Sequence, residues 1–484
     1  MGASDQVNRG DAAYLLQRSI DGVWTTAPAM LSVEGGKIVG ISAAKSASTS
    51  LVMPALANAH DHGRGLRTLA FGAGDDALEV WIASLGREPA TDPYLRAAVA
   101  FARMAESGVA ALNHCHGSAD PHRTVDEAEA VSRAAREIGI RVAFAVPIWG
   151  RNPWTYGDPA PFFDRLPPEQ VAQLRSAEGT WPSAAAQLAM LDAITAFEHE
   201  TFSVQYGPVG PQWVDDATLE RIAAGSAETG RRVHMHLFET RYQKEWASAA
   251  YPGGLLQHLD RIGLLSDRLT VAHGVYLDAE DCALLAARGV TVSLNSSSNL
   301  RLRSGLAPVA TYLAAGVRFG LGLDGLAFDD DEDALRELRV AWRLQRGWGA
   351  DDVLTRDRLL DAALIDGRRS ILGADGGGTI APGAPADILT LDTARITGDI
   401  LEGGADLVDL LVARARNEDV RGLHVGGRAV VVEGRATGID RAAAEVELLA
   451  QARASGCPPL TSEDHAVRAA LAAYYRCGCH TNLG

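Results

Sequence analysis

LVMPALANAHDH, residues 51–62, is a short apolar run that ends in two histidines one residue apart. In a β-strand successive side chains point to opposite faces, so His60 and His62 project from the same face and can reach one ion. The same residue types return further along the chain in His234, His236, Glu239, His273 and Asp324. Imidazole and carboxylate groups suit Zn²⁺ and neighbouring first-row metals, so the set predicts one divalent metal site.

Apolar, β-rich segments alternate with helix-like stretches between residues 51 and 325, which is typical of parallel strands joined by helical crossovers. The eight apolar segments are Leu51–Leu56, Val109–Asn113, Arg141–Ile148, Phe202–Tyr206, Arg232–Leu237, Leu269–Ala272, Val290–Asn295 and Val317–Leu323. Eight β/α units predict an α/β fold with a TIM-like (β/α)8 barrel, whose active site lies where the strands end. The candidate metal-site residues close or closely follow these segments, so we expect them on one rim.

The rest of the chain is expected to form a smaller domain. Strand-like segments 29–33 and 37–41 flank a Gly35-Gly36 turn, and strand-like segments return at 386–391 and 423–433. We therefore predict a small β-sandwich domain that is built from both chain ends. The expected divisions are 1–53 and 371–436 for the sandwich, 54–370 for the barrel, and 437–484 for a C-terminal helical extension.

Composition and charge exclude several kinds of partner. The 484 residues are 47% hydrophobic, and 45 basic against 61 acidic residues give a net charge of −16. This charge repels nucleic acid and anionic membranes, and no apolar run nears the ~20 residues that span a bilayer. Residues 1–11 lack the pattern of a secretory signal. We expect a cytoplasmic protein that acts on a small molecule, with a homodimer or higher homo-oligomer left open.

Five cysteines are few and odd in number for a chain of this length, which argues against a disulfide framework. Reduced thiols are the simpler expectation. Cys477, Cys479 and His480 resemble a metal clip, but no second ligand pair follows at zinc-finger spacing. A plain chain end is therefore favoured over a structural zinc site.

The ordered motifs resemble the amidohydrolase superfamily, and within it the cytosine deaminase-like group of nucleobase and triazine deaminases and chlorohydrolases. The motifs that carry the resemblance are His60-Asp61-His62, His234-Met235-His236-Leu237-Phe238-Glu239, Ala272-His273-Gly274, Ser296-Ser297-Ser298-Asn299 and Gly322-Leu323-Asp324-Gly325. The resemblance implies that the metal ligands are His60, His62, His234 and Asp324. It also implies that Glu239 and His273 move protons around the bound water, while Asp324 accepts a hydrogen bond from that water.

The resemblance further implies a single metal ion. Relatives with two metals usually carry a bridging lysine at the end of strand four, where this chain reads Phe202-Ser203-Val204-Gln205-Tyr206. We expect Zn²⁺, and the ligand types leave Fe²⁺ and Mn²⁺ open.

Departures from the family pattern fall around the substrate. Gly207-Pro208-Val209-Gly210-Pro211 replaces a stretch in which many relatives carry a substrate-binding histidine, and Asn295 stands where relatives often carry histidine. The candidate substrate contacts are His236, Arg64, His116, Trp149, Trp154 and Asn295. Each has a structural alternative: a hydrogen-bonded barrel-end pair for His116, a surface ion pair for Arg64, and packing of the 147–182 segment onto its own barrel for the two tryptophans.

These features predict a metal-dependent hydrolase that deaminates a nitrogen heterocycle or cyclic amidine with a metal-activated water. Glu239 would pass the water proton to the ring nitrogen and then to the departing amine. One alternative is cleavage of a urea, amide or carbamate bond, or loss of chloride from a triazine. A non-catalytic assembly protein on the same barrel is disfavoured, because all the expected ligands are present.

Overall fold

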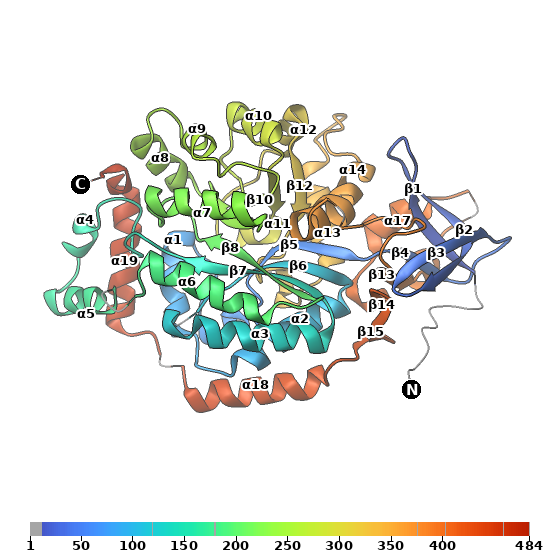
Figure 1. The fold of residues 1–484 in the computed structure, drawn as a ribbon, viewed down its shortest axis with the longest axis horizontal. Helices are drawn as coiled ribbons and strands as arrows, with labels where there is room; N and C mark the ends of the chain where they lie inside the picture. The colour runs from blue at the N-terminus through green and yellow to red at the C-terminus, as the bar shows by residue number, and fades with distance from the viewer. Residues whose placement is uncertain are drawn as a thin grey trace.

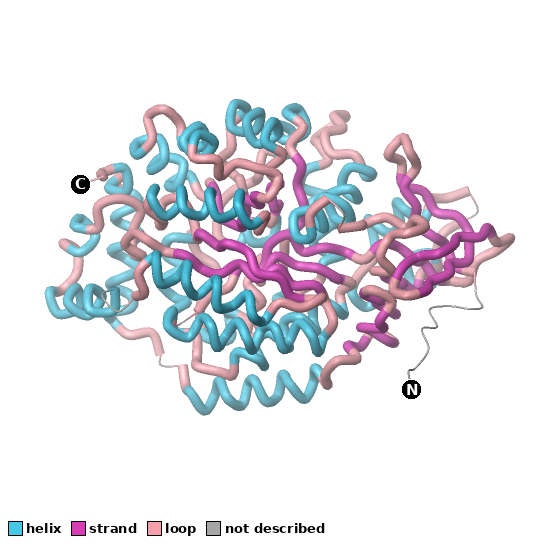
Figure 2. The backbone as a smooth tube through the Cα atoms, in the orientation of Figure 1, coloured by secondary structure: helices cyan, strands magenta, loops and turns pink. Residues whose placement is uncertain are grey.

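The computed structural model describes residues 12–118, 120–178, 181–374, 376–401, 403–457 and 459–483. Its centre is an eight-stranded, all-parallel sheet in which the strands follow one another in chain order (Figures 1 and 2). These strands are β5 (Leu56–Asp61), β6 (Val109–Cys115), β7 (Arg141–Ile148), β8 (Phe202–Pro208), β9 (Val233–Leu237), β10 (Leu269–His273), β11 (Thr291–Leu294) and β12 (Arg318–Leu321). The segment after β12 returns to β5, where the Asp324 amide donates to the His60 carbonyl at 2.9 Å. The predicted (β/α)8 barrel is confirmed as a nearly closed barrel.

Helices cover the outside of the barrel, and several of them turn an apolar stripe toward it. In α3 (Thr124–Ile138), Ala128, Val131, Ala135 and Ile138 are buried at helical spacing, and Gly139 ends the helix in the left-handed region at φ 93°. The other helices between barrel strands are α1 (Leu78–Trp81), α2 (Pro93–Glu106), α4 (Ala160–Phe163), α5 (Pro168–Glu178), α6 (Ala184–Ile194), α7 (Asp216–Thr229), α8 (Arg241–Ala250), α9 (Leu255–Arg261), α10 (Ala279–Arg288), α11 (Ser296–Arg301) and α12 (Val309–Ala315). Those between β12 and the C-terminal extension are α13 (Ala334–Gln345), α14 (Arg356–Asp361), α15 (Gly367–Leu372), α16 (Ala394–Thr397) and α17 (Leu407–Arg414).

A second, curled sheet is built from both chain ends, as predicted (Figure 1). Its order is β16-β15-β14-β13-β4-β1-β2-β3, and β4 pairs antiparallel with β13 where the two ends meet. Its strands are β1 (Ala13–Arg18), β2 (Trp24–Glu34), β3 (Lys37–Ala43), β4 (Ser50–Pro54), β13 (Ile388–Asp392), β14 (Val420–Val425), β15 (Arg428–Val432) and β16 (Arg435–Ala436). Gly35 and Gly36, at φ 55° and 74°, form the turn between β2 and β3.

The first predicted barrel strand is wrong in its position. Residues 51–54 belong to β4 of the second sheet, and the barrel strand β5 begins only at Leu56. The chain changes sheets between them: the Ala55 amide donates to the Asp387 carbonyl, and the Leu56 amide donates to the Gly108 carbonyl. Every residue from 51 to 61 is buried, so burial does not change where the chain passes from one sheet to the other.

A buried ion pair ties the second sheet to the barrel. Asp387, before β13, contacts Arg368 of α15, and its Oδ2 lies 3.0 Å from Nε of Arg141 at the start of β7. The amide of Gly426 donates to Oδ1 of the same carboxylate at 2.6 Å. Arg368 and Asp387 are 1% and 6% exposed, so both charges depend on each other for solvation.

The C-terminal extension forms two helices, α18 (Arg441–Ser455) and α19 (Ser462–Arg476). The first packs on α2, and the second packs on α1 and α4 at the end of the molecule opposite the second sheet (Figure 1). Cys477 and Cys479 are paired in a disulfide, which differs from the expectation of reduced thiols. The His480 ring is buried and lies 2.7 Å from Glu245 of α8, so this carboxylate is its partner here.

The long segment after β7 forms α4 and α5 and packs on the barrel. Trp149 meets the rings of Trp181 and Trp213, and Tyr156 is fully buried. Over the described residues, no helix is long and apolar enough to cross a membrane. Residues 1–11, which were expected to lack a secretory signal, lie outside the described residues.

Candidate metal centre

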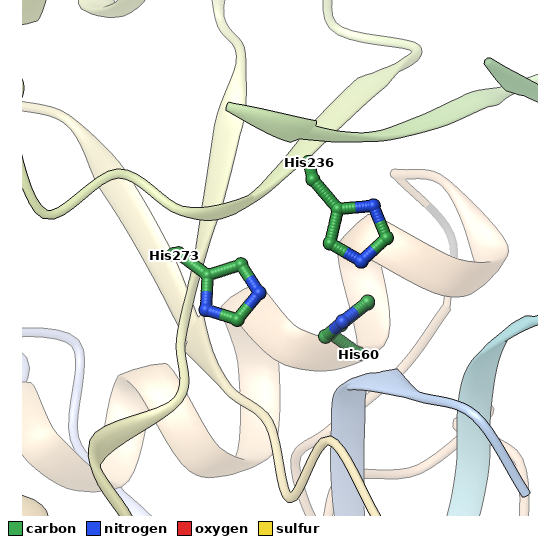
Figure 3. Close-up of side chains that lie close together, drawn as sticks. All are labelled: His60, His236 and His273. Carbon is green, nitrogen blue, oxygen red and sulfur yellow. The ribbon is translucent and has the colours of Figure 1, made fainter. Parts of the chain in front are cut away.

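Four imidazoles and one carboxylate converge at the carboxyl ends of the barrel strands. They are His60 and His62 at the end of β5, His236 in β9, His273 at the end of β10, and Asp324 after β12. Figure 3 shows the rings of His60, His236 and His273 facing one shared space. The ring centroid of His60 lies 4.9 Å from that of His236 and 5.3 Å from that of His273. Oδ1 of Asp324 lies 3.0 Å from Nε2 of His60 and 3.2 Å from Nε2 of His62.

The outer nitrogens of these rings are held by the surrounding protein. Nδ1 of His62 lies 2.9 Å from the Cys115 carbonyl, and Nδ1 of His236 lies 2.7 Å from the Val209 carbonyl. A carbonyl only accepts, so both Nδ1 atoms carry the proton and both Nε2 atoms present a lone pair. Nδ1 of His273 is similarly placed 2.9 Å from Oδ1 of Asn299.

This arrangement fits a divalent cation. In neutral His62 the Nε2 lone pair faces a carboxylate oxygen of Asp324, and two acceptors at 3.2 Å require a proton or a cation between them. Nε2 of His60 is also buried and makes no hydrogen bond, although it lies 3.0 Å from the same oxygen. Neutral imidazole and carboxylate are the donors that zinc and its neighbours prefer.

Electrostatics keep the rings available as ligands. Burial lowers the pKa of His62 and of His273 to about 4, and it lowers the pKa of His236 well below the ordinary value. Burial opposes ionisation of Asp324, but the adjacent His60 and His62 outweigh it and lower the pKa of this carboxyl well below its ordinary value. Near pH 7, His62, His236 and His273 therefore offer neutral nitrogens and Asp324 offers an ionised carboxylate, as metal binding requires.

His234 and His236 both point into the barrel, but at different depths. His236 is in two of the groups whose ligand atoms lie within 4.8 Å of one another, together with His60 and His273 or with His62 and Cys115. His234, the residue that the resemblance implied as a ligand, stands behind His60, with its Nε2 2.6 Å from Nδ1 of that ring. The geometry therefore favours His236 over His234 as a ligand.

Glu239 lies beside the cluster in the turn after β9. Its Oε2 is 3.6 Å from Nε2 of His273, and Ser304 donates to its Oε1 at 3.4 Å. Burial, followed by the charges of Asp324 and Glu79, raises the pKa of Glu239 well above its ordinary value. A carboxyl whose pKa is raised by burial next to a metal site can both give and take a proton.

Three residues at or beside this site have strained backbone conformations. Phe238, His273 and Asp324 adopt φ angles of 48°, 75° and 61°, in the region that residues other than glycine rarely occupy. Such conformations persist where the surrounding structure enforces them, and they gather at functional sites. Here each one sets the direction of a side chain at the end of a barrel strand or beside it.

The predicted substrate contacts fall into two groups. Asn295 reaches the site, with its Nδ2 3.2 Å from Nδ1 of His273, and Arg64 lies near Gly325 with its Nη1 3.7 Å from Glu88. His116 is turned away, because it bonds Glu127 of α3 at 2.8 Å and packs on Phe144. Trp149 and Trp154 pack against the main apolar core. His116 is therefore tied to α3, and the two tryptophans contribute to the packing of the core.

The site also contains residues that the sequence prediction did not place there. Asn299 holds His273, and Cys115 places its sulfur beside His62 and His236. Alternation along β6 offers a signal for Cys115: Asn113 points into the barrel and bonds the Ala59 carbonyl, so Cys115 points inward as well. His114 and His116 then face the helices.

The C-terminal extension reaches the turn that carries Glu239 through a chain of contacts. The Tyr156 amide donates to the Tyr475 hydroxyl of α19 at 3.3 Å, and the Tyr156 hydroxyl donates to Glu79 at 3.0 Å. Thr240, next to Glu239, donates to the same Glu79 oxygen at 2.5 Å. The last helix thus supports the loop after β9.

Known proteins with similar sequences include deaminases. The Amidohydrolase family is matched over residues 51–430. A 5-methylthioadenosine/S-adenosylhomocysteine deaminase of Desulforudis audaxviator is 37% identical over 188 residues, which cover 39% of this chain and 44% of that protein. A 5'-deoxyadenosine deaminase of Methanoregula boonei is 30% identical over 352 residues, which cover 71% of this chain and 72% of that protein.

Among solved structures, the adenosine deaminase of Xanthomonas campestris with bound zinc has a TM-score of 0.74 and 25% identity, and the match covers 92% of this chain and 96% of that one. The barrel, the converging histidines and the extent of the match lead to one assignment. The chain belongs to the amidohydrolase family.

Proposed function

We propose that this enzyme is a metal-dependent hydrolase that deaminates an amino-substituted nitrogen heterocycle and releases ammonia. The main observation that supports this proposal is the contact at Asp324, where Nε2 of His62 and a carboxylate oxygen face each other at 3.2 Å. A cation satisfies both acceptors, and the buried Glu239 supplies a proton carrier beside it.

His60, His62, His236 and Asp324 would hold the metal, with His273 next to them. This set replaces His234 with His236, because a ring nitrogen of His236 lies within 4.8 Å of one of His60 and of one of His62. Zinc is the ion that we propose, and its presence in the similar adenosine deaminase supports the choice. When bound, such an ion lowers the pKa of its water to about 7 and so provides a nucleophile at neutral pH.

The chain's own residues handle the protons. Glu239 would take a proton from the attacking water, deliver it to the ring nitrogen of the substrate, and assist the departing amine. His273, fixed by Asn299, would hold the attacking water oxygen in line through its Nε2 side. The side chain of His62 is 18% exposed while those of His60, His273 and Asp324 are at most 5% exposed, so substrate would approach from the His62 side.

The substrate class follows from the relatives, whose names include deaminases of 5'-deoxyadenosine and of 5-methylthioadenosine. We propose a 6-aminopurine nucleoside or a related aminated heterocycle.

A turnover screen tests this function. The full chain, loaded with zinc, is incubated with adenine nucleosides, free aminopurines, pterins, pyrimidines and triazines, and the released ammonia is measured. We expect ammonia from at least one purine nucleoside. Release of an alkylamine or chloride without ammonia would instead identify the urea, amide or triazine alternative. A chain that binds no stoichiometric metal and turns over nothing would contradict the proposal.

A further inference from the structure

Cys115 brings a sulfur atom to the candidate metal centre. It is the last residue of β6 and is 5% exposed. Its sulfur, one ring nitrogen of His62 and one ring nitrogen of His236 all lie within 4.8 Å of one another. Two ligands of one zinc ion lie about 3.5 to 4.5 Å apart, given Zn–N near 2.1 Å and Zn–S near 2.3 Å. The three groups can therefore reach one ion with a small shift.

The surroundings of this thiol differ from those of an ordinary buried cysteine. Cys282 of α10 packs in the main apolar core, as buried free cysteines usually do. Cys115 belongs to none of the apolar clusters formed by the described residues, and its neighbours are imidazoles.

A second observation at the same place points to a ligand. Nε2 of His60 is fully buried, faces the cluster, and makes no hydrogen bond. Asp324 Oδ1 lies 3.0 Å from this nitrogen, and a buried nitrogen without a hydrogen bond calls for a further partner such as a bound ion.

We propose that Cys115 supplies a sulfur ligand to the metal in the substrate-free enzyme, so that the centre has nitrogen, oxygen and sulfur donors. This inference rests on the metal site of the proposed function. Binding breaks the S–H bond and forms a metal–sulfur bond, and the proton leaves to the buffer, so no oxidant or reductant is needed. Thiolate ligands favour Zn²⁺ over Mn²⁺, which prefers oxygen. A Cys115 ligand would therefore make the site selective for Zn²⁺ over Mn²⁺.

Zinc X-ray absorption of the full chain tests the inference directly. We expect a sulfur scatterer at about 2.3 Å in the wild type. Cys115→Ser should lose it, and the matched variant Cys282→Ser, at the other buried free thiol, should keep it. Zinc-over-manganese selectivity, measured by competition, should fall roughly tenfold or more in Cys115→Ser alone.

Three results separate the possibilities. A wild-type protein with one zinc per chain but only nitrogen and oxygen neighbours overturns the sulfur ligand and leaves the proposed function intact. A sulfur signal that persists in Cys115→Ser assigns the ion to other cysteines and also overturns it. If Cys115→Ser does not fold, the wild-type spectrum and the ultraviolet sulfur-to-metal band of the cadmium-substituted wild type decide. Failure of the proposed function would appear instead as absence of ammonia release.

Discussion

Nε2 of His234 lies 2.6 Å from Nδ1 of His60, with the two rings stacked at an interplanar angle of 22°. His60 presents its other nitrogen to Asp324, so His234 occupies the place that a carbonyl occupies behind His62 and behind His236. A partner in this place fixes the tautomer and direction of a metal-binding imidazole. We therefore regard His234 as a positioning residue.

Replacement of His234 by leucine should weaken metal binding by about 10- to 100-fold, because Nδ1 of His60 loses its buried partner. His234→Gln, whose amide oxygen can accept the same hydrogen bond, should recover part of the loss. Competition with a chelator measures both affinities. Equal affinity in His234→Leu and the wild type would show that the contact has no influence on the metal.

Glu239→Gln should lower turnover by about 100- to 10,000-fold while the metal content stays unchanged, because the carboxyl carries protons and is not proposed as a ligand. Ser304→Ala, which removes only a hydrogen bond at 3.4 Å to this carboxyl, should have a smaller effect. Turnover and elemental analysis of the same samples test the two statements together. Loss of metal in Glu239→Gln would contradict the role.

Asp387→Asn should destabilise the protein by about 3 to 5 kcal/mol, because it leaves the guanidinium of Arg368 buried without its counter-charge. Asp399→Asn is a suitable control. Asp399 pairs with Arg414 at the surface with 70% of its side chain exposed, and such pairs contribute little. Chemical unfolding should separate the two variants clearly. Similar curves for both would mean that the buried pair does not hold the second sheet to the barrel.

Glu337 of α13 should make stability depend on pH. Burial, against the hydrogen bonds from Ser297, raises the pKa of Glu337 to about 7 from an ordinary value of 4.5. The folded state therefore holds a proton that the unfolded state has already released, so this stabilisation is complete below pH 4.5 and is lost as the pH rises through 7. The change amounts to at most about 3 kcal/mol.

Glu337→Gln stays neutral at every pH and should gain apparent melting temperature relative to the wild type between pH 5 and pH 8. Other titrating groups are shared by both proteins, so the difference between the two curves isolates Glu337. Parallel curves would show that the carboxyl is ionised in the folded protein throughout this range.

Much of the fold could be predicted because the strands are long apolar runs that end in polar residues. Arg141–Ile148, for example, has the same limits in prediction and structure. The first strand was misplaced because residues 51–61 are buried without interruption across two sheets. The domain boundaries, the cytoplasmic location and the oligomeric state stay predictions.

The residue types of the site could be predicted, but the depth of each side chain along the barrel could not. His234 and His236 share a strand face by alternation, so only the structure distinguishes the ring that meets the other ligands from the ring that supports His60. His116 was ambiguous for a related reason. Alternation alone does not say which set of β6 residues faces inward, and contacts with Glu127 and Phe144 place His116 outside. The positions of Trp149 and Trp154 depend on long-range packing, and a local sequence pattern does not contain that information.

The supporting position of α19 has a consequence for biosynthesis. The barrel strands leave the ribosome first, and domains generally begin to fold in that order. Tyr475 and His480 emerge after all eight strands, yet they contact Tyr156 and Glu245 around the loop that follows β9. A nascent chain can therefore complete the barrel strands before the segment beside Glu239 gains its outer support.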